Sequence, residues 1–307
     1  MAASTPNSRL NVVVGLDLTE RSEPAFARAV RLAQEHNGEL FILHVVSAYL
    51  PDAIANAHTE YANTIIQDHA SRARGSGLSD VTQVLARGRD YETIVEHAKQ
   101  TDADLVVLGT HRSRGMVADL LGTTVDRVLR LSGRPILLVQ RRTSHSYKRI
   151  LVAVDFSSAS RIALGFVFKL FPEAEVLVVN TWGRRHRPKE IVHTEAPEDS
   201  EAHRLALSAF VQEIADKAGP RPDGEARQIT KIVETGRPET IIPDLAEERL
   251  ADLVVVGTHA RTGLTHLFLG SVAQEIMLRV STDVLAVPPP LLSESNDKIV
   301  RDTLLVA

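Results

Sequence analysis

Short apolar runs alternate with amphipathic stretches along the whole chain of 307 residues. A short apolar run bounded by turn residues predicts a strand, and apolar residues at every third or fourth position predict a helix. Asn37-Gly38 supplies a normal stop for the first of these helices. In the first half the pattern predicts strands at residues 11–16, 40–46, 81–86, 105–108 and 136–139, with helices at 23–36, 56–74, 91–100 and 123–131.

The second half repeats the same order of elements. It predicts strands at residues 150–154, 176–180, 228–233, 253–256 and 284–287, with helices at 160–171, 201–217, 239–248 and 271–280. Strands that alternate with helices in this way build βαβ units, in which a parallel sheet is covered by helices on both faces. The pattern therefore predicts a protein of the α/β class.

The two halves also match residue by residue. Residues 103–111 read ADLVVLGTH and residues 251–259 read ADLVVVGTH, so eight of nine positions agree at an offset of 148 residues. The same offset holds without a gap to the end of the last predicted strand, and a match of this length is very improbable by chance. We therefore predict a duplication, with one domain at residues 9–140, a second at 148–290 and a tail beyond.

The offset is smaller near the start of each copy. Asp17 and Asp155 each end the first strand of a copy, and they are only 138 residues apart. The second copy therefore holds about ten extra residues, which we expect in a surface excursion around residues 183–203. The joint at residues 141–148 is short and polar, which predicts a partly exposed connector. The tail, residues 291–307, either docks as a strand or frays, and we expect it to fray.

Composition excludes several classes of protein. Aromatic residues make up 4% of the chain, so Val, Leu, Ile and Ala must build the core. A net charge of −4 argues against binding DNA or RNA through a basic surface, and the lack of cysteine excludes disulfides and cysteine-type zinc sites. The start, MAASTPNSRL, does not resemble a signal peptide, and no apolar run reaches membrane-spanning length. We therefore expect a cytoplasmic protein with no membrane partner.

Three features recur at equivalent places in both copies. They are an Asp that ends the first strand, a glycine that opens the loop after the fourth strand, and a Gly-Thr or Gly-Ser pair that opens the next helix. In open parallel sheets, ligands bind outside the carboxyl ends of the strands, where the strand order reverses. If the first and fourth strands are neighbours, all these features meet there: Asp17, Gly109, Gly122 and Thr123 in the first copy, and Asp155, Gly257, Gly270 and Ser271 in the second.

This combination suits a nucleotide. A helix N-terminus offers free amides to a phosphate, and a glycine lets the backbone approach an anion closely. The carboxylate can accept hydrogen bonds from a ribose hydroxyl or a base amine, and three loop arginines can pair with phosphates: Arg112, Arg114 and Arg261. Each feature also has a structural explanation, because Asp caps turns, Gly fits tight bends, and Thr or Ser caps helices. Their joint recurrence favours a pocket.

Other motifs are absent or weak. The sequence contains no P-loop, no G-x-G-x-x-G after a strand, no G-x-S-x-G and no H-E-x-x-H. His111 and His259 follow the loop glycines by two residues, but no second ligand lies at a convincing spacing. Loop packing or a phosphate contact therefore explains them better than a metal. His44 ends the second strand and has Asn180 as its counterpart, which argues against a required imidazole there.

The loop after the fourth strand carries a resemblance to a known family. Copy two reads GTHARTGLTHLFLGS and copy one reads GTHRSRGMVADLLGT. Together with the Asp that ends the first strand, this pattern resembles the universal stress protein family. ATP-binding members of that family have a glycine, two residues, a second glycine, nine residues, and then glycine with Ser or Thr. The resemblance covers about residues 9–140 and 148–288, nearly the whole chain.

The resemblance implies two tandem Rossmann-like domains, each with a five-stranded parallel sheet of order 3-2-1-4-5. It implies that the loop holds ATP, with or without Mg²⁺, and that Val45 and Thr181 face the adenine. It further implies a regulatory role in stress survival without a well-defined catalytic reaction. Family domains pair through their last strands, here residues 136–139 and 284–287, which would make the chain an intrachain pair. Pairing of two whole chains and the identity of protein partners stay open.

The second glycine of the family pattern is missing in both copies. Ala260 replaces it in copy two and Arg112 replaces it in copy one. If that position needs a left-handed backbone, a non-glycine residue costs about 1–2 kcal/mol. Alanine adds only a methyl group, whereas Arg112 either covers the phosphate site or binds the phosphates. We therefore expect copy two to be the better site. The alternatives are a scaffold without nucleotide that acts through protein partners, and a slow ATPase, for which the sequence shows no general base.

Overall fold

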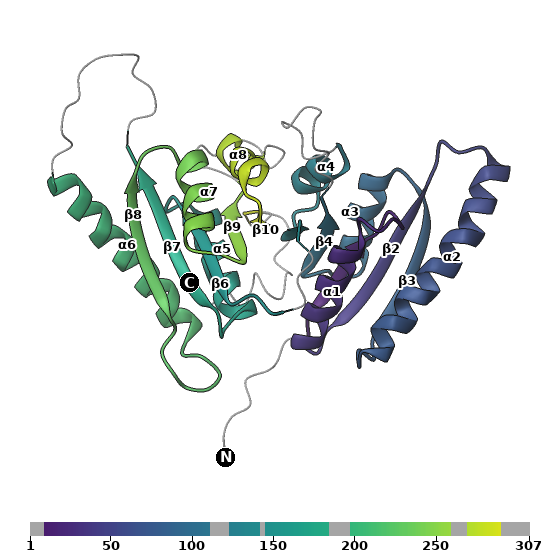
Figure 1. The fold of residues 1–307 in the computed structure, drawn as a ribbon, viewed down its shortest axis with the longest axis horizontal. Helices are drawn as coiled ribbons and strands as arrows, with labels where there is room; N and C mark the ends of the chain where they lie inside the picture. The colour runs from purple at the N-terminus through teal and green to yellow at the C-terminus, as the bar shows by residue number, and fades with distance from the viewer. Residues whose placement is uncertain (1–8, 111–122, 142–144, 184–196, 259–268, 290–307) are drawn as a thin grey trace, which may run out of the picture. The chain divides into compact units, whose positions relative to one another are not determined.

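A computed structural model describes residues 9–110, 123–141, 145–183, 197–258 and 269–289 of the chain. By its contacts the chain divides into two compact units, Met1–Ser146 and Tyr147–Ala307. Each unit is an α/β structure in which strands and helices alternate, as the pattern of the sequence predicts (Figure 1).

In the first unit the elements follow the predicted order. They are β1 (Asn11–Gly15), α1 (Glu23–Glu35), β2 (Glu39–Ser47), α2 (Asp52–Gly75), β3 (Val81–Gly88), α3 (Asp90–Gln100), β4 (Leu105–Gly109), α4 (Thr123–Leu131) and β5 (Ile136–Val139). Helix α2 begins four residues before the predicted start at residue 56. Pro51, whose φ is fixed near the helical value, and Asp52 in the first turn together favour the earlier start.

In the second unit the same order returns. The elements are β6 (Arg149–Val154), α5 (Ser158–Leu170), β7 (Glu175–Trp182), α6 (Pro197–Ala218), β8 (Ile229–Thr235), α7 (Pro238–Glu248), β9 (Leu253–Gly257), α8 (Ser271–Arg279) and β10 (Asp283–Val287). Helix α6 begins at Pro197, so part of the excursion expected at residues 183–203 is helical.

The strand order within each unit is the one that the resemblance implies. In the first unit β1 lies between β2 and β4, with β3 and β5 outside them, and all of these pairs are parallel. In the second unit β6 lies between β7 and β9, with β8 and β10 outside them. The order 3-2-1-4-5 is thus confirmed in both units. The order reverses at the first strand, which is where this type of sheet holds its ligands.

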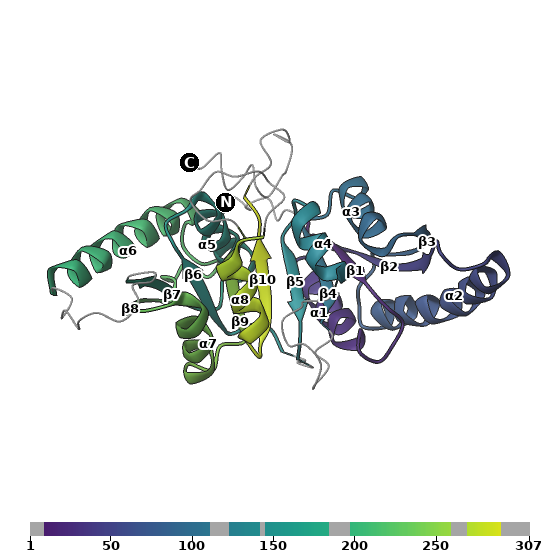
Figure 2. The same cartoon turned by 90° about the horizontal axis from the view of Figure 1, so that it is seen from above.

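Helices cover both faces of each sheet, as Figure 2 shows from above. In the first unit α1 and α2 lie on one face and α3 packs with α4 on the other. In the second unit α5 packs with α6, and α7 packs with α8. The inner strands are therefore buried on both faces. Their side chains are almost all aliphatic, as the low aromatic content predicts.

The extra residues of the second copy lie in two places. The number of residues that separates equivalent positions in the two copies grows along the chain. It is 136 in strand two, from His44 to Asn180, and 141 in the following helix, from Ile66 to Leu207. At the end of strand three it is 148, from Gly88 to Gly236. Five extra residues therefore precede the helix core and seven follow it, two of them at the end of α6 and five in the loop before β8. The prediction that all of them lie around residues 183–203 is wrong in part. The helices share a burial pattern but few identities, so the sequence alone did not reveal the second step.

The joint between the units is held on both sides. Arg28 of α1 is 2% exposed and donates from Nη1 to the backbone oxygen of His145 at 2.8 Å. Tyr147 is buried in the second unit, where its hydroxyl donates to Asp283 at 2.6 Å. The predicted connector therefore includes one fully packed residue, which its polar composition did not indicate.

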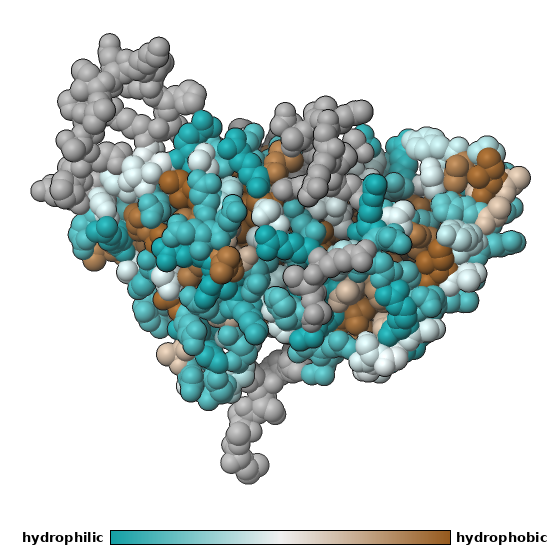
Figure 3. Space-filling model, viewed as in Figure 1, coloured by the Kyte–Doolittle hydropathy of each residue, from teal (hydrophilic) through white to brown (hydrophobic). Residues whose placement is uncertain are grey.

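The surface is mostly hydrophilic in the view of Figure 3, with separate hydrophobic areas. In the part of the chain that the structure describes, the large hydrophobic side chains that are exposed lie at Tyr49, Ile54, Tyr61, Leu131, Leu205 and Leu250. Among the described residues, no helix combines the length and the hydropathy that a membrane span requires. The tail at residues 291–307 lies outside the described residues.

Candidate functional site

The first and fourth strands of each unit are neighbours, and this brings the predicted site residues to one edge. Gly15 of β1 pairs with Leu108 of β4, so Asp17 and Gly109 follow immediately at the carboxyl ends of adjacent strands. In the second unit the pairing of β6 with β9 places Asp155 and Gly257 in the same way. The condition on which the predicted site depended is therefore met in both units.

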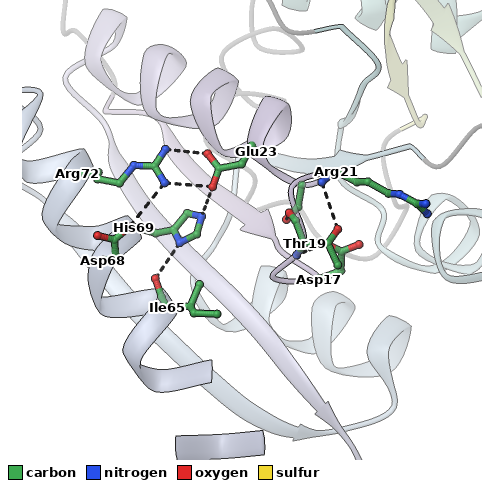
Figure 4. A network of polar contacts seen from close by, with 9 residues as sticks. Asp17, Thr19, Arg21, Glu23, Ile65, Asp68, His69 and Arg72 are labelled. Atoms are coloured by element: carbon green, nitrogen blue, oxygen red, sulfur yellow. Dashed lines mark hydrogen bonds and ion pairs between the residues drawn. The ribbon is translucent and has the colours of Figure 1, made fainter. Parts of the chain in front are cut away.

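Asp17 is exposed and forms a tight turn with the residues that follow (Figure 4). Its Oδ1 accepts hydrogen bonds from the backbone nitrogen of Thr19 at 2.9 Å and from the Thr19 hydroxyl at 2.8 Å. Leu18, between them, has a left-handed backbone with φ of 59°. Such a conformation costs a non-glycine residue about 1–2 kcal/mol, so the surrounding contacts must hold it in place.

Asp155 repeats this turn in the second unit. Its Oδ1 accepts from the backbone nitrogen of Ser157 at 3.0 Å, and Phe156 has a φ of 63°. Ser157 then caps α5, because its hydroxyl accepts from the backbone nitrogen of Ser160 at 3.2 Å. In both units the Asp thus has a structural role in starting the first helix. One carboxylate oxygen serves the turn.

A buried polar residue in strand two holds the chain just before each Asp. His44 donates from Nδ1 to the backbone oxygen of Leu16 at 2.8 Å, and Asn180 donates from Nδ2 to the backbone oxygen of Val154 at 2.8 Å. An imidazole and an amide therefore perform the same task, which agrees with the sequence argument that no imidazole is required. Each also leaves one buried acceptor, Nε2 or Oδ1, without a hydrogen-bond partner among the described residues.

This difference between the copies predicts a pH effect on stability. Burial lowers the pKa of His44 from its ordinary value of about 6.5, and His58 lowers it further. The backbone oxygen of Leu16 and the carboxylates of Asp90 and Asp17 oppose that shift. Because the folded pKa is depressed, neutral His44 contributes stability above pH 6.5 that is lost as the pH falls toward the folded pKa.

We expect His44→Asn, which copies the second unit, to reduce the loss of stability of the first unit between about pH 7 and pH 5. The amide keeps the hydrogen bond to Leu16 but binds no proton in this range. The reciprocal variant Asn180→His should add a pH dependence to the second unit. Urea unfolding at a series of pH values measures both. Equal slopes for wild type and His44→Asn would contradict the assignment.

The glycines that end the fourth strands are not equivalent. A Cβ on Gly257 would lie 3.0 Å from the backbone nitrogen of Ser160 and 3.0 Å from the Cβ of Ala159. A Cβ on Gly109 would find its nearest neighbour, the backbone oxygen of Arg21, at 3.4 Å. The sequence argument placed these glycines in the nucleotide site. At Gly257 the close neighbour is the start of α5, so packing already requires a glycine there.

The start of α8 lies beside the end of β9. The backbone nitrogen of Gly270 donates to the backbone oxygen of Thr258 at 2.7 Å, which fixes the helix start to the strand end. Gly270 is the N-cap residue and provides no side-chain cap, and Ser271 opens the helix with an exposed side chain. In this respect α8 differs from α5, which Ser157 caps. An uncapped helix start offers its first amides to an anion.

The remaining predicted site residues lie either at the ends of elements or outside the described residues. Thr123 opens α4, but its side chain is outside the described part of the structure. Val45 and Thr181 are half-buried at the ends of β2 and β7, next to the residues that hold the first strand. The other predicted residues lie outside the described residues: Gly122, Arg112, Arg114, Ala260, Arg261, His111 and His259.

Two features of this edge were not among the predicted site residues. Arg89 and Arg237 are the N-cap residues of α3 and α7, which follow the carboxyl ends of β3 and β8. Their separation by 148 residues, the offset of the repeat, was a signal that could have found them.

In the second unit Trp182 ends β7 and stacks on His203 of α6, with ring centroids 4.7 Å apart. Trp182 is the single tryptophan of the chain. Among the described residues, no group of three or more His, Asp or Glu could hold a metal ion.

The same arrangement of strands, turns and glycines is present in both units, and a comparison with protein families identifies the family to which it belongs. The model of the universal stress protein family matches residues 9–140 and again residues 146–288. The chain belongs to the universal stress protein family. As a universal stress protein with two family domains, it is 26% identical over 298 residues to universal stress protein E of Salmonella typhi, covering 91% of this chain and 94% of that one.

Solved structures share this tandem fold. A protein of unknown function from Pseudomonas aeruginosa PAO1 aligns with a TM-score of 0.66 at 19% identity, covering 98% of both chains. A universal stress protein from Archaeoglobus fulgidus aligns with a TM-score of 0.64 at 19% identity, covering 92% of this chain and 97% of that one. Both likenesses extend over nearly the whole length, so the two-domain organisation of this universal stress protein is shared with them.

Proposed function

We propose that this chain binds an adenine nucleotide, ATP with or without Mg²⁺, and acts as a regulator of stress survival through protein partners. The observation that carries the proposal is the meeting of Asp155, Gly257 and the uncapped start of α8 at one edge of the sheet. The amides at the helix start suit phosphate oxygens, and the carboxylate of Asp155 suits a ribose hydroxyl. In this proposal the phosphates of ATP are the anion that the first amides of α8 bind.

We propose the second unit as the better nucleotide site. The position of the second glycine in the family pattern is occupied by Ala260 there and by Arg112 in the first unit, and a methyl group is the smaller obstacle. Strand two also differs, because Thr181 offers a hydroxyl where the first unit has Val45. A hydroxyl can hydrogen-bond to a base, whereas valine offers only packing.

A scaffold without nucleotide is the second candidate. The turns at Asp17 and Asp155 and the close packing at Gly257 give these residues structural roles that need no ligand. A duplicated fold would retain such residues even if the pockets were vestigial. This candidate predicts no nucleotide in the denatured protein and no effect of added ATP on the melting temperature.

The decisive measurement identifies the nucleotide that the purified full chain releases on denaturation, together with its molar ratio. A ratio near one per chain is expected if only the second unit binds. A ratio near two would show that both units bind and that Arg112 contacts the phosphates. No nucleotide, with no shift of the melting temperature by ATP, would support the scaffold instead.

Asp155→Asn tests the site residue itself. Asparagine keeps Oδ1 for the backbone nitrogen of Ser157, so the turn can persist, but the variant lacks the charge that favours a ribose hydroxyl. Because hydrogen bonds to charged groups contribute about 1.5–3 kcal/mol, we expect the Kd for ATP to rise about tenfold or more. Fluorescence of Trp182 reports binding in the second unit, since it is the single tryptophan and lies beside Thr181.

The matched control is Asp17→Asn in the first unit. It makes the same chemical change in an equivalent turn, so it should leave the ATP dependence of Trp182 fluorescence unchanged. Equal weakening by both variants would contradict the assignment of the site to the second unit. An unchanged Kd in Asp155→Asn would remove Asp155 from the site.

A further inference from the structure

An ion pair joins the first two helices of the first unit (Figure 4). Arg72 of α2 donates from Nη1 and Nη2 to the two carboxylate oxygens of Glu23 in α1, at 3.1 and 2.7 Å. His69 of α2 adds a contact from Nε2 to Oε1 of Glu23 at 2.9 Å, while its Nδ1 donates to the backbone oxygen of Ile65. Here the first helix carries the anion, Glu23, and the second helix carries the cation, Arg72.

The second unit has an ion pair at the corresponding place with the charges exchanged. Arg161 of α5 lies 2.7 Å from Oε2 of Glu213 in α6, measured from Nη1. The guanidinium of Arg161 also lies over the ring of Phe210, which meets the ring of Phe156 edge-on. Here the first helix carries the cation and the second helix carries the anion.

The two ion pairs occupy equivalent positions. Glu23 and Arg161 are 138 residues apart, as are Asp17 and Asp155 at the ends of the preceding strands. In the second helices an offset of 141 residues brings the buried positions into register, as four pairs show: Ile66 and Leu207, His69 and Phe210, Ala70 and Val211, Ala73 and Ile214. The same offset pairs Arg72 with Glu213. The polarity of the contact is therefore reversed between two otherwise similar helix pairs.

The reversed polarity matters during folding, because each first helix can meet the second helix of either unit. Tandem domains of one fold are prone to wrong pairing of equivalent elements. If α6 docked on α1, Glu213 would face Glu23, and if α2 docked on α5, Arg72 and His69 would face Arg161. The buried positions have the same spacing in the two second helices but differ in side-chain size, with Ala70 and Ala73 in α2 against Val211 and Ile214 in α6, so the charges act beside a difference in packing. Like charges disfavour only the wrong pairings.

We infer that the reversed ion pairs select the partner of each helix, so that α1 accepts α2 and α5 accepts α6 but neither accepts the other's partner. The ion pairs are partly exposed, with side-chain exposures of 30% and 47% for Glu23 and Arg72 and 37% and 46% for Arg161 and Glu213. Such pairs add little to native stability. Their effect is on the choice between partners, which depends on the difference between matched and mismatched contacts.

The test gives the ion pairs of the two units the same polarity in the full chain. Arg161→Glu with Glu213→Arg gives the second unit the polarity of the first, and Glu23→Arg with His69→Phe and Arg72→Glu gives the first unit the polarity of the second. Two neighbouring charges would disturb the comparison, because Asp68 is 3.7 Å from Arg72 and Lys217 is 3.2 Å from Glu213. All chains, including the reference, therefore carry Asp68→Asn and Lys217→Gln.

The readout is the yield of natively folded protein after dilution from urea, measured by far-UV circular dichroism and by elution from size-exclusion chromatography at the volume of protein that was never unfolded. We expect either conversion alone to lower the yield of native protein by about twofold or more. A smaller change would mean that wrong pairing of the helices is infrequent. Both conversions together restore opposite polarity, so the yield should return to that of the reference chain. The urea midpoint of each chain, recorded in parallel, separates loss of native stability from wrong pairing.

Two outcomes would overturn the inference. One is a reference yield in both single conversions, which would show that polarity does not affect pairing. The other is a combined variant that refolds no better than the single conversions, which would show that the substitutions only weaken the native contacts. Neither outcome depends on nucleotide, so the result is independent of the proposed function.

Discussion

Gly38→Ala is expected to destabilise the first unit by about 3 kcal/mol, at the upper end of the range for overpacked sites. A Cβ at this position would lie 2.2 Å from the backbone oxygen of Leu10 and 3.1 Å from its carbonyl carbon. That oxygen cannot move away easily, because it accepts from the backbone nitrogen of Glu39 at 2.9 Å. Leu10 itself is only 2% exposed. The strain must therefore separate the end of α1 from the start of β1.

Gly75→Ala is the matched control for this prediction. Gly75 ends α2, and a Cβ there would meet no atom within 4 Å. Alanine also favours the helix by up to about 1 kcal/mol relative to glycine, so this variant should be neutral or slightly stabilising. Urea unfolding followed by circular dichroism measures both variants. A Gly38→Ala chain that unfolds like Gly75→Ala would show that the start of β1 yields more easily than its burial implies.

The glycines that end the fourth strands should respond unequally to the same substitution. Gly257→Ala is expected to destabilise the second unit by about 2 kcal/mol, because the new methyl group meets backbone atoms of α5. Gly109→Ala should cost less than about 0.5 kcal/mol, since its nearest neighbour lies at ordinary contact distance. Both glycines are followed by Thr-His, so the sequence around them gives no hint of this difference.

Unfolding of the two variants in urea measures this contrast directly. Measurement of ATP affinity in the same variants then separates packing from ligand binding at Gly257. If nucleotide affinity falls in Gly257→Ala while stability is unchanged, the close approach of a ligand, and not of α5, explains the glycine. Equal destabilisation by both substitutions would mean that α1 and α5 lie equally close to their fourth strands.

The architecture could be predicted because hydrophobic runs and repeated residues record it directly. Strands that are buried on both faces, such as β4 and β9, must be continuous apolar runs, and their alternation with helices predicts a parallel sheet. The strand order 3-2-1-4-5 was implied by the family resemblance. The prediction that Asp17 lies at one edge with Gly109, and Asp155 with Gly257, is confirmed, because the carboxyl ends of adjacent parallel strands lie together. Identical residues at a fixed offset were sufficient to find both domains.

The roles of individual side chains could not be predicted in the same way. An Asp that caps a turn and an Asp that binds a ribose look alike in one sequence, and only coordinates show that Oδ1 of Asp17 is used by Thr19. The equivalence of Glu23–Arg72 with Arg161–Glu213 was also hidden, because reversal of charge removes any identity between the positions. The extra residues after the core of α6 were not predicted for the same reason, since the second helices of the two units share their buried positions but not their residue types.

The packing of the joint has a practical consequence for dividing the chain into single domains. The bond between Ser146 and Tyr147 is the natural place to cut, because the backbone oxygen of His145 stays with Arg28 and the hydroxyl of Tyr147 stays with Asp283. A fragment that ended at Val139, the last residue of β5, would instead lose the carbonyl that accepts from a buried guanidinium. A fragment that began after Tyr147 would leave a space the size of a phenol ring in its core.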